Sequence, residues 1–388
     1  MKEVQENIEQ TTAEKRNPKF LPLLIAGIVV LALVAAVVLC LILSGKDSAA
    51  PTEDGSATSP TVLVGEGVAL PKFDSEILLC SQEAKQVYDG ELEIENAVAS
   101  GAPYRPFVFE YRLEQASGVL RISENSDLTN AQEFTLDKAN TSVTIDNLKT
   151  GTTYYYQVEV AGAQYSGSFK TAASNRFISV AGTENLRDIG GYTTLDGKTV
   201  KQGLLIRGCE MDGLKNKDYY VTDEEVVVVQ KTFGFVYDLD LRSSDISEAD
   251  YQTRLGADVI HRFYDAPSYA QIFRPEYSDS LRQIFADLAN PDNYPMYLHC
   301  TWGRDRTGTV IYLLLGLLNV SEEDLMEEYR LTGYVTLSVA TNTKMDVVRM
   351  SLDSYEGDTL QEKIISFLTT DIQVPMEDIE SIQSIFLD

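Results

Sequence analysis

The sequence contains very few of the residues that build metal centres. Its 388 residues include only two histidines, His261 and His299, and four cysteines. The cysteines lie far apart in the sequence, without the paired spacing that is typical of zinc sites. These numbers argue against a metal cluster, and we expect the protein to require neither a metal ion nor another cofactor.

The same scarcity argues against a disulfide framework. Cys40 lies in a long apolar run, and Cys300 lies in a polar loop that is described below. For the other two, Cys80 and Cys209, we expect buried free thiols, which behave as small apolar side chains. A Cys80–Cys209 bridge is one alternative. A reversible Cys209–Cys300 bond that protects a thiolate from irreversible oxidation is another.

Positive charge is also scarce. Lysine and arginine number 32 against 59 aspartates and glutamates, which gives a formal net charge of −27. Because nucleic-acid binding requires a basic surface, this balance argues against a nucleic-acid partner. The acidic excess is typical of a well-solvated surface.

One long apolar run stands out in this polar sequence. Leu23–Leu43 contains no charged residue. At ~1.5 Å per residue, its length of about 31 Å matches the hydrocarbon thickness of a bilayer. The run therefore predicts a transmembrane helix. A cleaved signal peptide is the alternative, with Ser48-Ala49-Ala50 as its cleavage site.

The flanking cations predict the orientation of this helix. Only Lys46 follows it closely, whereas it is preceded by Lys2, Lys15, Arg16 and Lys19. The more positive flank of a transmembrane helix stays in the cytoplasm. We therefore expect a single-pass signal anchor in the cell membrane, with the part of the chain after the anchor outside the cell.

Changes in composition divide the rest of the chain. A stretch rich in Ser, Ala, Thr, Gly and Pro reads as a flexible linker. Short alternating segments such as Phe107–Tyr111, separated by turn signals such as Ala161-Gly162, then predict an all-β sandwich. The expected order is a cytoplasmic tail (1–19), a membrane anchor (20–44), a linker (45–75), a β-sandwich (76–174) and a C-terminal domain (176–388).

Strands and helices alternate in the last of these regions. Phe233–Leu241 and Tyr294–His299 are expected to be buried strands, and Asp279–Leu288 and Thr309–Leu318 are expected to be helices. This pattern predicts an α/β domain with a mostly parallel central sheet flanked by helices.

The most informative segment connects the last predicted strand with the helix that follows it. Cys300 and Arg306 stand at the two ends of a short loop, with five residues between them. A strand, a tight loop and a helix N-terminus form an anion site, because unpaired backbone N–H groups point at one spot. Such positive surroundings favour a thiolate. The Arg306 guanidinium can hold two oxygens of a tetrahedral anion at once.

This Cys-x5-Arg spacing resembles the signature of the protein tyrosine phosphatase superfamily. The resemblance implies that Cys300 is a nucleophile that forms a phosphocysteine intermediate, and that Arg306 holds the phosphate through the transition state. It also implies that the Thr307 hydroxyl stabilises the thiolate. The residues expected around the phosphate are Thr301, Trp302, Gly303, Arg304, Thr307 and Gly308.

Further motifs resemble a bacterial tyrosine/serine phosphatase family. They occur in the order of that family, at Asn185–Tyr192, Gly203–Arg207, Asp240–Ser243 and Ser321–Tyr329. The resemblance covers about residues 176–388. It implies that Arg187 and Asp188 lie near the site, with an ion pair that holds a loop as the alternative role.

The preceding region carries a second resemblance. Leu148–Tyr154, together with Val158, is similar to the late-strand signature of fibronectin type III domains. The resemblance implies an adhesive or spacer module, whose partner the sequence does not specify. It also implies that Tyr154 forms a hydrogen bond to the backbone of the turn before it.

A phosphatase of this kind needs a carboxyl group that protonates the leaving group and then activates water. Three candidates are present. Asp265 lies on a predicted loop, Asp305 lies inside the cysteine loop, and Asp240 ends a predicted strand. We rank Asp265 first and Asp305 second. As alternatives, each caps a turn or pairs with an arginine, and Asp305 orients Arg304.

Three neighbouring residues have weaker assignments. We expect His299 to hydrogen-bond the loop backbone and so to affect the thiolate indirectly. Arg304 is either a surface cation or a second positive group for a substrate with several phosphates. Trp302 either stacks on a substrate ring or fills the wall of the site.

Together these features predict a membrane-anchored phosphatase for phosphate monoesters. The expected substrates are phosphotyrosine and also phosphoserine or phosphothreonine on proteins. Phosphoinositides or inositol phosphates are the alternative substrates. A surface protein that binds phosphate or takes part in adhesion without catalysis is the alternative to an enzyme.

Overall fold

The computed structural model describes most of the chain after the predicted linker. The described residues are 59–80, 103–243, 245, 253–334 and 343–388. The described residues all belong to one unit, Ala57–Asp388. Residues 1–56, with the predicted membrane span Leu23–Leu43, lie outside the described residues. Within the described ranges, no helix is long and apolar enough to cross a membrane.

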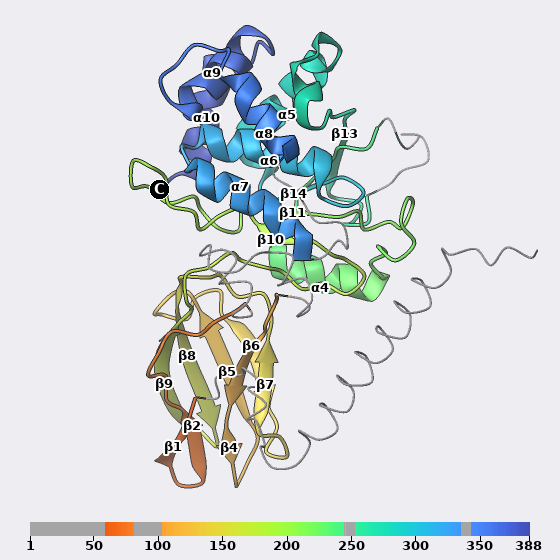
Figure 1. Ribbon diagram of the computed structural model, residues 1–388. Helices are drawn as coiled ribbons and strands as arrows, with labels where there is room; N and C mark the ends of the chain where they lie inside the picture. Colours follow the sequence, from red (N-terminus) through yellow and green to blue (C-terminus); the bar gives the residue numbers. More distant parts are fainter. Residues whose placement is uncertain (1–58, 81–102, 244, 246–252, 335–342) are drawn as a thin grey trace, which may run out of the picture. The chain divides into compact units, whose positions relative to one another are not determined.

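The strands described between residues 61 and 170 pair with one another in antiparallel fashion (Figure 1). They form sheets with the strand orders β1-β2-β4, β3-β7 and β6-β5-β8-β9. Their bounds are β1 Thr61–Gly65, β2 Val68–Pro71, β3 Phe107–Glu110, β4 Arg112–Leu113, β5 Gly118–Ser123, β6 Gln132–Leu136, β7 Ser142–Ile145, β8 Thr153–Val160 and β9 Ala163–Lys170.

Side chains from all three sheets share one hydrophobic core. Along β8, Tyr154, Tyr156 and Val158 are buried, whereas the residues between them are more exposed. This period of two is the alternation expected of a half-buried strand. Phe107 and Phe169 stack in the same core with ring centroids 4.4 Å apart. These contacts establish an all-β packing of sheet against sheet.

This β region begins earlier than the sequence predicts. The hairpin of β1 and β2 falls within the predicted linker at 45–75. Gly67, with a φ of 67°, makes the turn, and the residues of β2 that follow are buried. β2 also pairs with β4. The apolar Val68–Leu70 segment is thus strand, and the predicted linker is too long at its C-terminal end.

Tyr154 fixes the turn before β8. The backbone N–H of Lys149 donates a hydrogen bond to the Tyr154 hydroxyl at 2.8 Å. Burial of the ring raises the pKa of Tyr154 to about 12. The contact confirms the predicted hydrogen bond between this tyrosine and the turn.

The second region is an α/β domain built on a five-stranded sheet with the order β10-β11-β14-β12-β13. The pairs β11–β14, β14–β12 and β12–β13 are parallel, whereas β10 joins the edge antiparallel. The strands are β10 Arg187–Asp188, β11 Leu205–Gly208, β12 Tyr237–Asp240, β13 Ile260–Phe263 and β14 Met296–His299. The predicted mostly parallel sheet is confirmed.

Helices cover both faces of this sheet (Figure 1). Leu205, Met296 and Leu298 pack on one face, in a core that includes α5, α6, α9 and α10. The alternate residues Ile206 and Tyr297 pack on the other face, in a core that includes α4. The helices are α4 Asp223–Phe233, α5 Ser278–Ala289, α6 Asp305–Leu317, α7 Glu322–Arg330, α8 Thr343–Leu352, α9 Leu360–Thr370 and α10 Met376–Phe386.

One predicted strand is too long. Phe233–Leu241 was expected to be extended, but Phe233 is the last residue of α4 and the strand begins only at Tyr237. Thr222 caps the helix N-terminus by accepting a hydrogen bond from the Glu225 backbone N–H at 3.3 Å. Gly234 ends the helix in the left-handed conformation, with a φ of 65°. The caps thus outweigh the strand propensity of the valines within this helix.

Candidate active site

The cysteine loop connects β14 with α6. β14 ends at His299 and α6 begins at Asp305, four residues before the predicted helix start at Thr309. The flanking strands β11 and β12 run parallel to β14, so their carboxyl ends meet at the same edge of the sheet. The predicted order of strand, loop and helix is confirmed. The loop lies where sheets of this type bind ligands.

Three successive carbonyl groups of the loop are held from outside. They belong to Thr301, Trp302 and Gly303. The donors are, in the same order, the backbone N–H of Glu210 at 3.1 Å, the side-chain amide of Asn185 at 3.0 Å and the guanidinium of Arg207. In a planar trans peptide, the following N–H points away from the carbonyl. The N–H groups of residues 302, 303 and 304 therefore face the inside of the loop beside the N-terminus of α6, an arrangement that suits an anion.

Gly303 is the one loop position that requires glycine. Its φ is 65°, a left-handed conformation that L side chains rarely adopt. A Cβ atom there would lie 2.3 Å from the Gly208 carbonyl oxygen, far inside van der Waals contact. The close approach of this loop to the end of β11 thus depends on the missing side chain.

Two buried arginines behind the loop share one carboxylate. Arg207 donates to the two Glu328 oxygens at 2.8 and 2.7 Å, and Arg187 donates to one of them at 2.9 Å. Burial and the neighbouring Arg207 lower the pKa of Arg187 to about 10. The Arg187 guanidinium therefore stays charged at neutral pH. One carboxylate against two cations leaves a net positive charge behind the loop, which favours a bound anion.

His299 lies directly before the cysteine and is fully buried. Its Nδ1 lies 3.3 Å from the Cys300 carbonyl oxygen, and its Nε2 lies 3.1 Å from Asp238 Oδ1. Burial lowers the pKa of His299, but the Asp240 and Asp238 carboxylates outweigh it and raise the pKa to about 9. The ring is therefore protonated at neutral pH, so Nδ1 donates to the Cys300 carbonyl oxygen while Nε2 faces the Asp238 carboxylate as an ion pair. This is the indirect, structural position that the sequence suggests.

The protonated His299 predicts a loss of stability at alkaline pH. Its pKa is about 9 in the folded protein, against a reference value of 6.5. A group with a raised folded pKa stabilises the fold fully below its unfolded pKa, and this contribution is lost as the pH rises through the folded value. We expect the free energy of unfolding to fall between those two pH values, by on the order of 3 kcal/mol from this group.

Urea unfolding at several pH values measures this loss. The decline should be smaller in His299→Asn than in the wild type. The control is Asp279→Asn, which removes an exposed carboxylate paired with Arg282 at 2.9 Å, leaves His299 and its carboxylates in place and should keep the decline. An equally steep decline in His299→Asn would show that another group is responsible.

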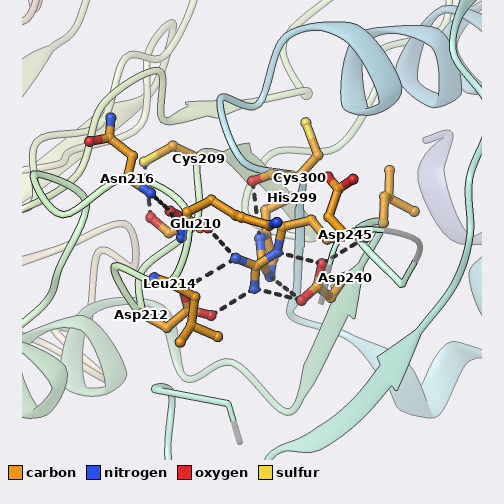
Figure 2. Close-up of polar contacts among 12 residues, drawn as sticks. Cys209, Glu210, Asp212, Leu214, Asn216, Asp240, Asp245, His299 and Cys300 are labelled. Atoms are coloured by element: carbon orange, nitrogen blue, oxygen red, sulfur yellow. Dashed lines mark hydrogen bonds and ion pairs between the residues drawn. The ribbon is translucent and has the colours of Figure 1, made fainter. Parts of the chain in front are cut away.

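A cluster of carboxylates surrounds the buried Arg242, next to His299 (Figure 2). Arg242 donates to Asp212 and to Asp240, each at 2.7 Å, and to Glu210. Burial opposes the ionised form of Asp240, but His299 and Arg242 hold its pKa well below the usual range. A carboxylate that stays ionised has no proton to give. The structure therefore argues against Asp240 as the general acid.

Asp305 is also held in its ionised form. Its carboxylate accepts hydrogen bonds from Arg304 Nε at 3.0 Å and from the Tyr269 hydroxyl. Burial opposes ionisation, but these two donors lower the pKa of Asp305. The geometry favours the alternative role, in which Asp305 orients Arg304, over that of a proton donor.

Asp265, the first-ranked acid, follows β13 at the same edge of the sheet as Cys300. Its backbone forms an isolated antiparallel bridge with Arg242, and its side chain is half-buried. Among the described residues, no hydrogen bond or ion pair joins Asp265 to Cys300 or Arg306. The structure thus brings Asp265 to the correct edge without a contact that would assign its role.

The two ends of the signature lie at the mouth of the loop. Cys300 is a free thiol with 3 % exposure. Arg306 donates to the Leu241 carbonyl oxygen at 3.2 Å and to Asp245 Oδ2 at 2.6 Å. The buried Thr307 hydroxyl has no hydrogen-bond partner within the described part of the chain. That hydroxyl is available to a thiolate, in keeping with its predicted role.

Trp302 and Arg304 differ in how they are held. The Trp302 side chain is 45 % exposed, and its ring meets that of Tyr219 edge-on at 5.3 Å. It therefore stands at the rim of the loop, where a substrate ring can reach it. Arg304 pairs with Asp305, so it is not a plain surface cation.

The motif residues before β11 support the loop from a distance. Arg187 donates to Asn185, which holds the Trp302 carbonyl. Asp188 pairs with Arg176 at 2.7 Å and accepts the Gly203 backbone N–H at 2.7 Å. These contacts favour the alternative role, ion pairs that hold loops.

The three cysteines in the described ranges, Cys80, Cys209 and Cys300, are free and buried. The expected free thiols are thus observed, and neither alternative bond is present among them. Cys209 accepts a hydrogen bond from the Glu184 backbone N–H at 3.2 Å, and burial raises the pKa of its thiol. It is therefore a poor nucleophile.

Sequence reasoning missed two acidic residues of this region, Glu328 and Asp245. Glu328 had a usable signal, because it follows Leu325 by three residues and so shares the apolar face of α7. A charge on an apolar face indicates a buried ion pair. Asp245 had no comparable signal, since only the folded chain brings it to Arg306.

An amide-lined loop between a central parallel strand and a buried helix defines an α/β domain of the phosphatase type. The sequence profile of the tyrosine phosphatase family matches residues 178–387, more than half of the chain. The chain therefore belongs to the tyrosine phosphatase family, a family of phosphate-ester hydrolases.

A curated relative is similar over a shorter segment. The probable tyrosine-protein phosphatase DG1060 of Dictyostelium discoideum is 46 % identical over 43 residues. The match covers 11 % of this chain and 26 % of that protein. The chain thus spans about a quarter of the length of this relative.

Proposed function

We propose that the protein hydrolyses phosphate monoesters, with phosphotyrosine and also phosphoserine or phosphothreonine on proteins as substrates. The observation that carries this proposal is the outward anchoring of three loop carbonyls, which turns the amides towards one anion next to Cys300. The Cys300 thiolate attacks phosphorus and forms a phosphocysteine as the ester oxygen leaves. Arg306 holds the phosphoryl oxygens, and water then cleaves the S–P bond.

We also propose a membrane anchor and a spacer module. The length of Leu23–Leu43 and its preceding cations support a single-pass anchor with the catalytic domain outside the cell. The strand order β6-β5-β8-β9 and the hydrogen bond of Tyr154 support a fibronectin type III-like domain. Such a domain would hold the catalytic domain away from the membrane or bind a surface partner.

The purified full-length chain should release phosphate from a phosphotyrosine peptide, and a chelator should not reduce the rate. Intact cells that express the chain should hydrolyse the same peptide when it is added outside, because it cannot cross the membrane. Binding without hydrolysis by the purified chain would support the phosphate-binding alternative. Hydrolysis that appears only after lysis would show that the orientation is inverted.

One observation favours phosphoinositides or inositol phosphates as a second candidate. A cavity of about 400 Å³ adjoins Asp305 and is lined in part by Arg274 and Lys344. Two cations beside the loop suit a second phosphate on the same molecule. Phosphoinositide vesicles in the same assay test this candidate. Arg304→Ala should then impair hydrolysis of the polyphosphorylated substrate and spare that of the peptide.

A further inference from the structure

Arg306 is held by a carboxylate that the functional proposal leaves without a role. Its Nη2 lies 2.6 Å from Asp245 Oδ2, and its Nη1 lies 3.2 Å from the Leu241 carbonyl oxygen. Burial lowers the pKa of Arg306, whereas Cys300 and Asp245 raise it. Both groups therefore lie close to the same guanidinium, which places Asp245 beside the position of the phosphate.

The position of Asp245 is fixed by the end of β12. Its backbone N–H donates to the Arg242 carbonyl oxygen at 2.7 Å, which closes a turn, and the Ser243 N–H donates to the Tyr264 carbonyl oxygen at 3.2 Å. Arg242 is itself buried and pairs with three carboxylates. Asp245 thus stands on a supported turn, with its side chain about one-third exposed.

We propose that Asp245 is the proton donor to the leaving group in the hydrolysis proposed above. A phosphate dianion that binds Arg306 comes to lie next to the Asp245 carboxyl. Two anions do not both stay ionised in one site, so the phosphate favours the protonated carboxyl. The bound substrate thereby favours the protonated form of Asp245, which is the form that can donate a proton to the leaving group.

The two chemical steps conserve atoms and protons. As the Cys300 sulfur bonds to phosphorus, the P–O bond to the leaving group breaks, and the Asp245 proton passes to the leaving oxygen. Asp245 is then a carboxylate and accepts a proton from the water that attacks phosphorus. The S–P bond breaks, inorganic phosphate is released, and both the thiolate and the protonated carboxyl are restored.

The other candidate acids, Asp240, Asp265 and Asp305, form no ion pair with Arg306 among the described residues. Asp240 and Asp305 are held ionised by partners other than Arg306, the arginine proposed to bind the phosphate. Asp265 lies at the same edge but has no ion pair with Arg306 in the described part of the chain. Of these four carboxylates, only Asp245 pairs with Arg306. The charge of the bound substrate therefore acts directly on Asp245.

The test uses the full-length chain with a series of esters, from an acidic nitrophenol leaving group to phenol and a simple alcohol. A good leaving group needs no proton, whereas a poor one does. We expect Asp245→Asn to retain hydrolysis of the nitrophenyl ester within a few-fold, and to lose about 10²- to 10⁴-fold in kcat on phenyl and alkyl esters. Asp245→Glu should recover part of that loss.

The matched control is Asp223→Asn, because Asp223 also pairs with an arginine, Arg254, at 2.7 Å. It should keep the wild-type dependence on the leaving group. A uniform gain of affinity in Asp245→Asn would overturn the inference, since Asp245 would then merely compete with phosphate for Arg306. A selective loss in Asp265→Asn instead would also overturn it. A wild type inactive on every ester would refute the proposed function itself.

Discussion

Cys300→Ser is expected to abolish hydrolysis while the fold and phosphate binding survive. The loop that holds the anion is anchored through its backbone, so a change from sulfur to oxygen leaves that geometry in place. A serine hydroxyl stays protonated at neutral pH and is a weak nucleophile without a base. We expect kcat to fall by on the order of 10⁴-fold or more, as for other essential nucleophiles.

Two measurements separate chemistry from binding in this variant. Steady-state hydrolysis of para-nitrophenyl phosphate gives kcat, and quenching of tryptophan emission by vanadate gives binding. Trp302 is the single tryptophan of the chain and lies in the loop, so its emission reports on this site. Cys80→Ser, a matched change at another buried thiol, should keep both values. Near-normal hydrolysis by Cys300→Ser would contradict the assignment of the nucleophile.

Glu328→Gln is expected to cause the largest loss of stability. The Glu328 carboxylate is the shared partner of Arg187 and Arg207, and all three side chains are buried. Its neutralisation leaves two guanidiniums close together without a counter-charge. Breaking a buried ion pair by removing one partner costs about 3–5 kcal/mol. Activity should fall as well, because Arg207 holds the Gly303 carbonyl of the loop.

Denaturant unfolding and steady-state kinetics at low temperature test both effects. The control is Asp353→Asn, which removes an exposed ion pair with Lys363 at 2.7 Å and should change the free energy of unfolding little. If Glu328→Gln were as stable as this control, the two arginines would not depend on the shared carboxylate.

The sequence predicts the cysteine loop well because its information is local. The apolar strand, the polar loop and the apolar helix follow one another without a break, and Cys300 and Arg306 stand at its ends. The supports of the loop are not local. Asn185 and Trp302 are 117 residues apart, and Arg207 and Glu328 are 121 residues apart. Nothing in either segment identifies the other, so only the folded chain shows these contacts.

In the fold, too, the features that depend on local sequence were predictable, and those that depend on distant partners were not. The mostly parallel sheet was predictable, because buried strands and amphipathic helices alternate along the chain. The valines of α4 have strand propensity, and they are helical because Thr222 and Gly234 cap that segment. The hairpin of β1 and β2 was missed because its apolar residues directly follow a stretch rich in Ser, Thr, Gly and Pro. Its burial comes from pairing with β4, a partner more than forty residues away.

Closeness to Cys300 in the sequence or in the sheet is not enough to identify the general acid. Asp305 and Asp240 are close to the cysteine in sequence or in the sheet, but their protonation is set by neighbours that the sequence does not place. Tyr269 and Arg304 hold one of them, and Arg242 holds the other. Charge partners, more than proximity, decide which carboxyl can carry a proton.

The carbonyl groups of the loop are anchored from outside, so the backbone of the loop and its side chains have separate tasks. The backbone forms the proposed anion site, and an exposed side chain such as Trp302 can contact the rest of the substrate. The scaffold holds Trp302 through its carbonyl, whereas its indole contacts Tyr219 at the rim of the loop. We therefore expect a substitution of Trp302 to alter which esters are preferred while the hydrogen bonds that anchor the cysteine loop stay in place. Selectivity in this enzyme family can evolve, or be engineered, one side chain at a time on a chemically unchanged core.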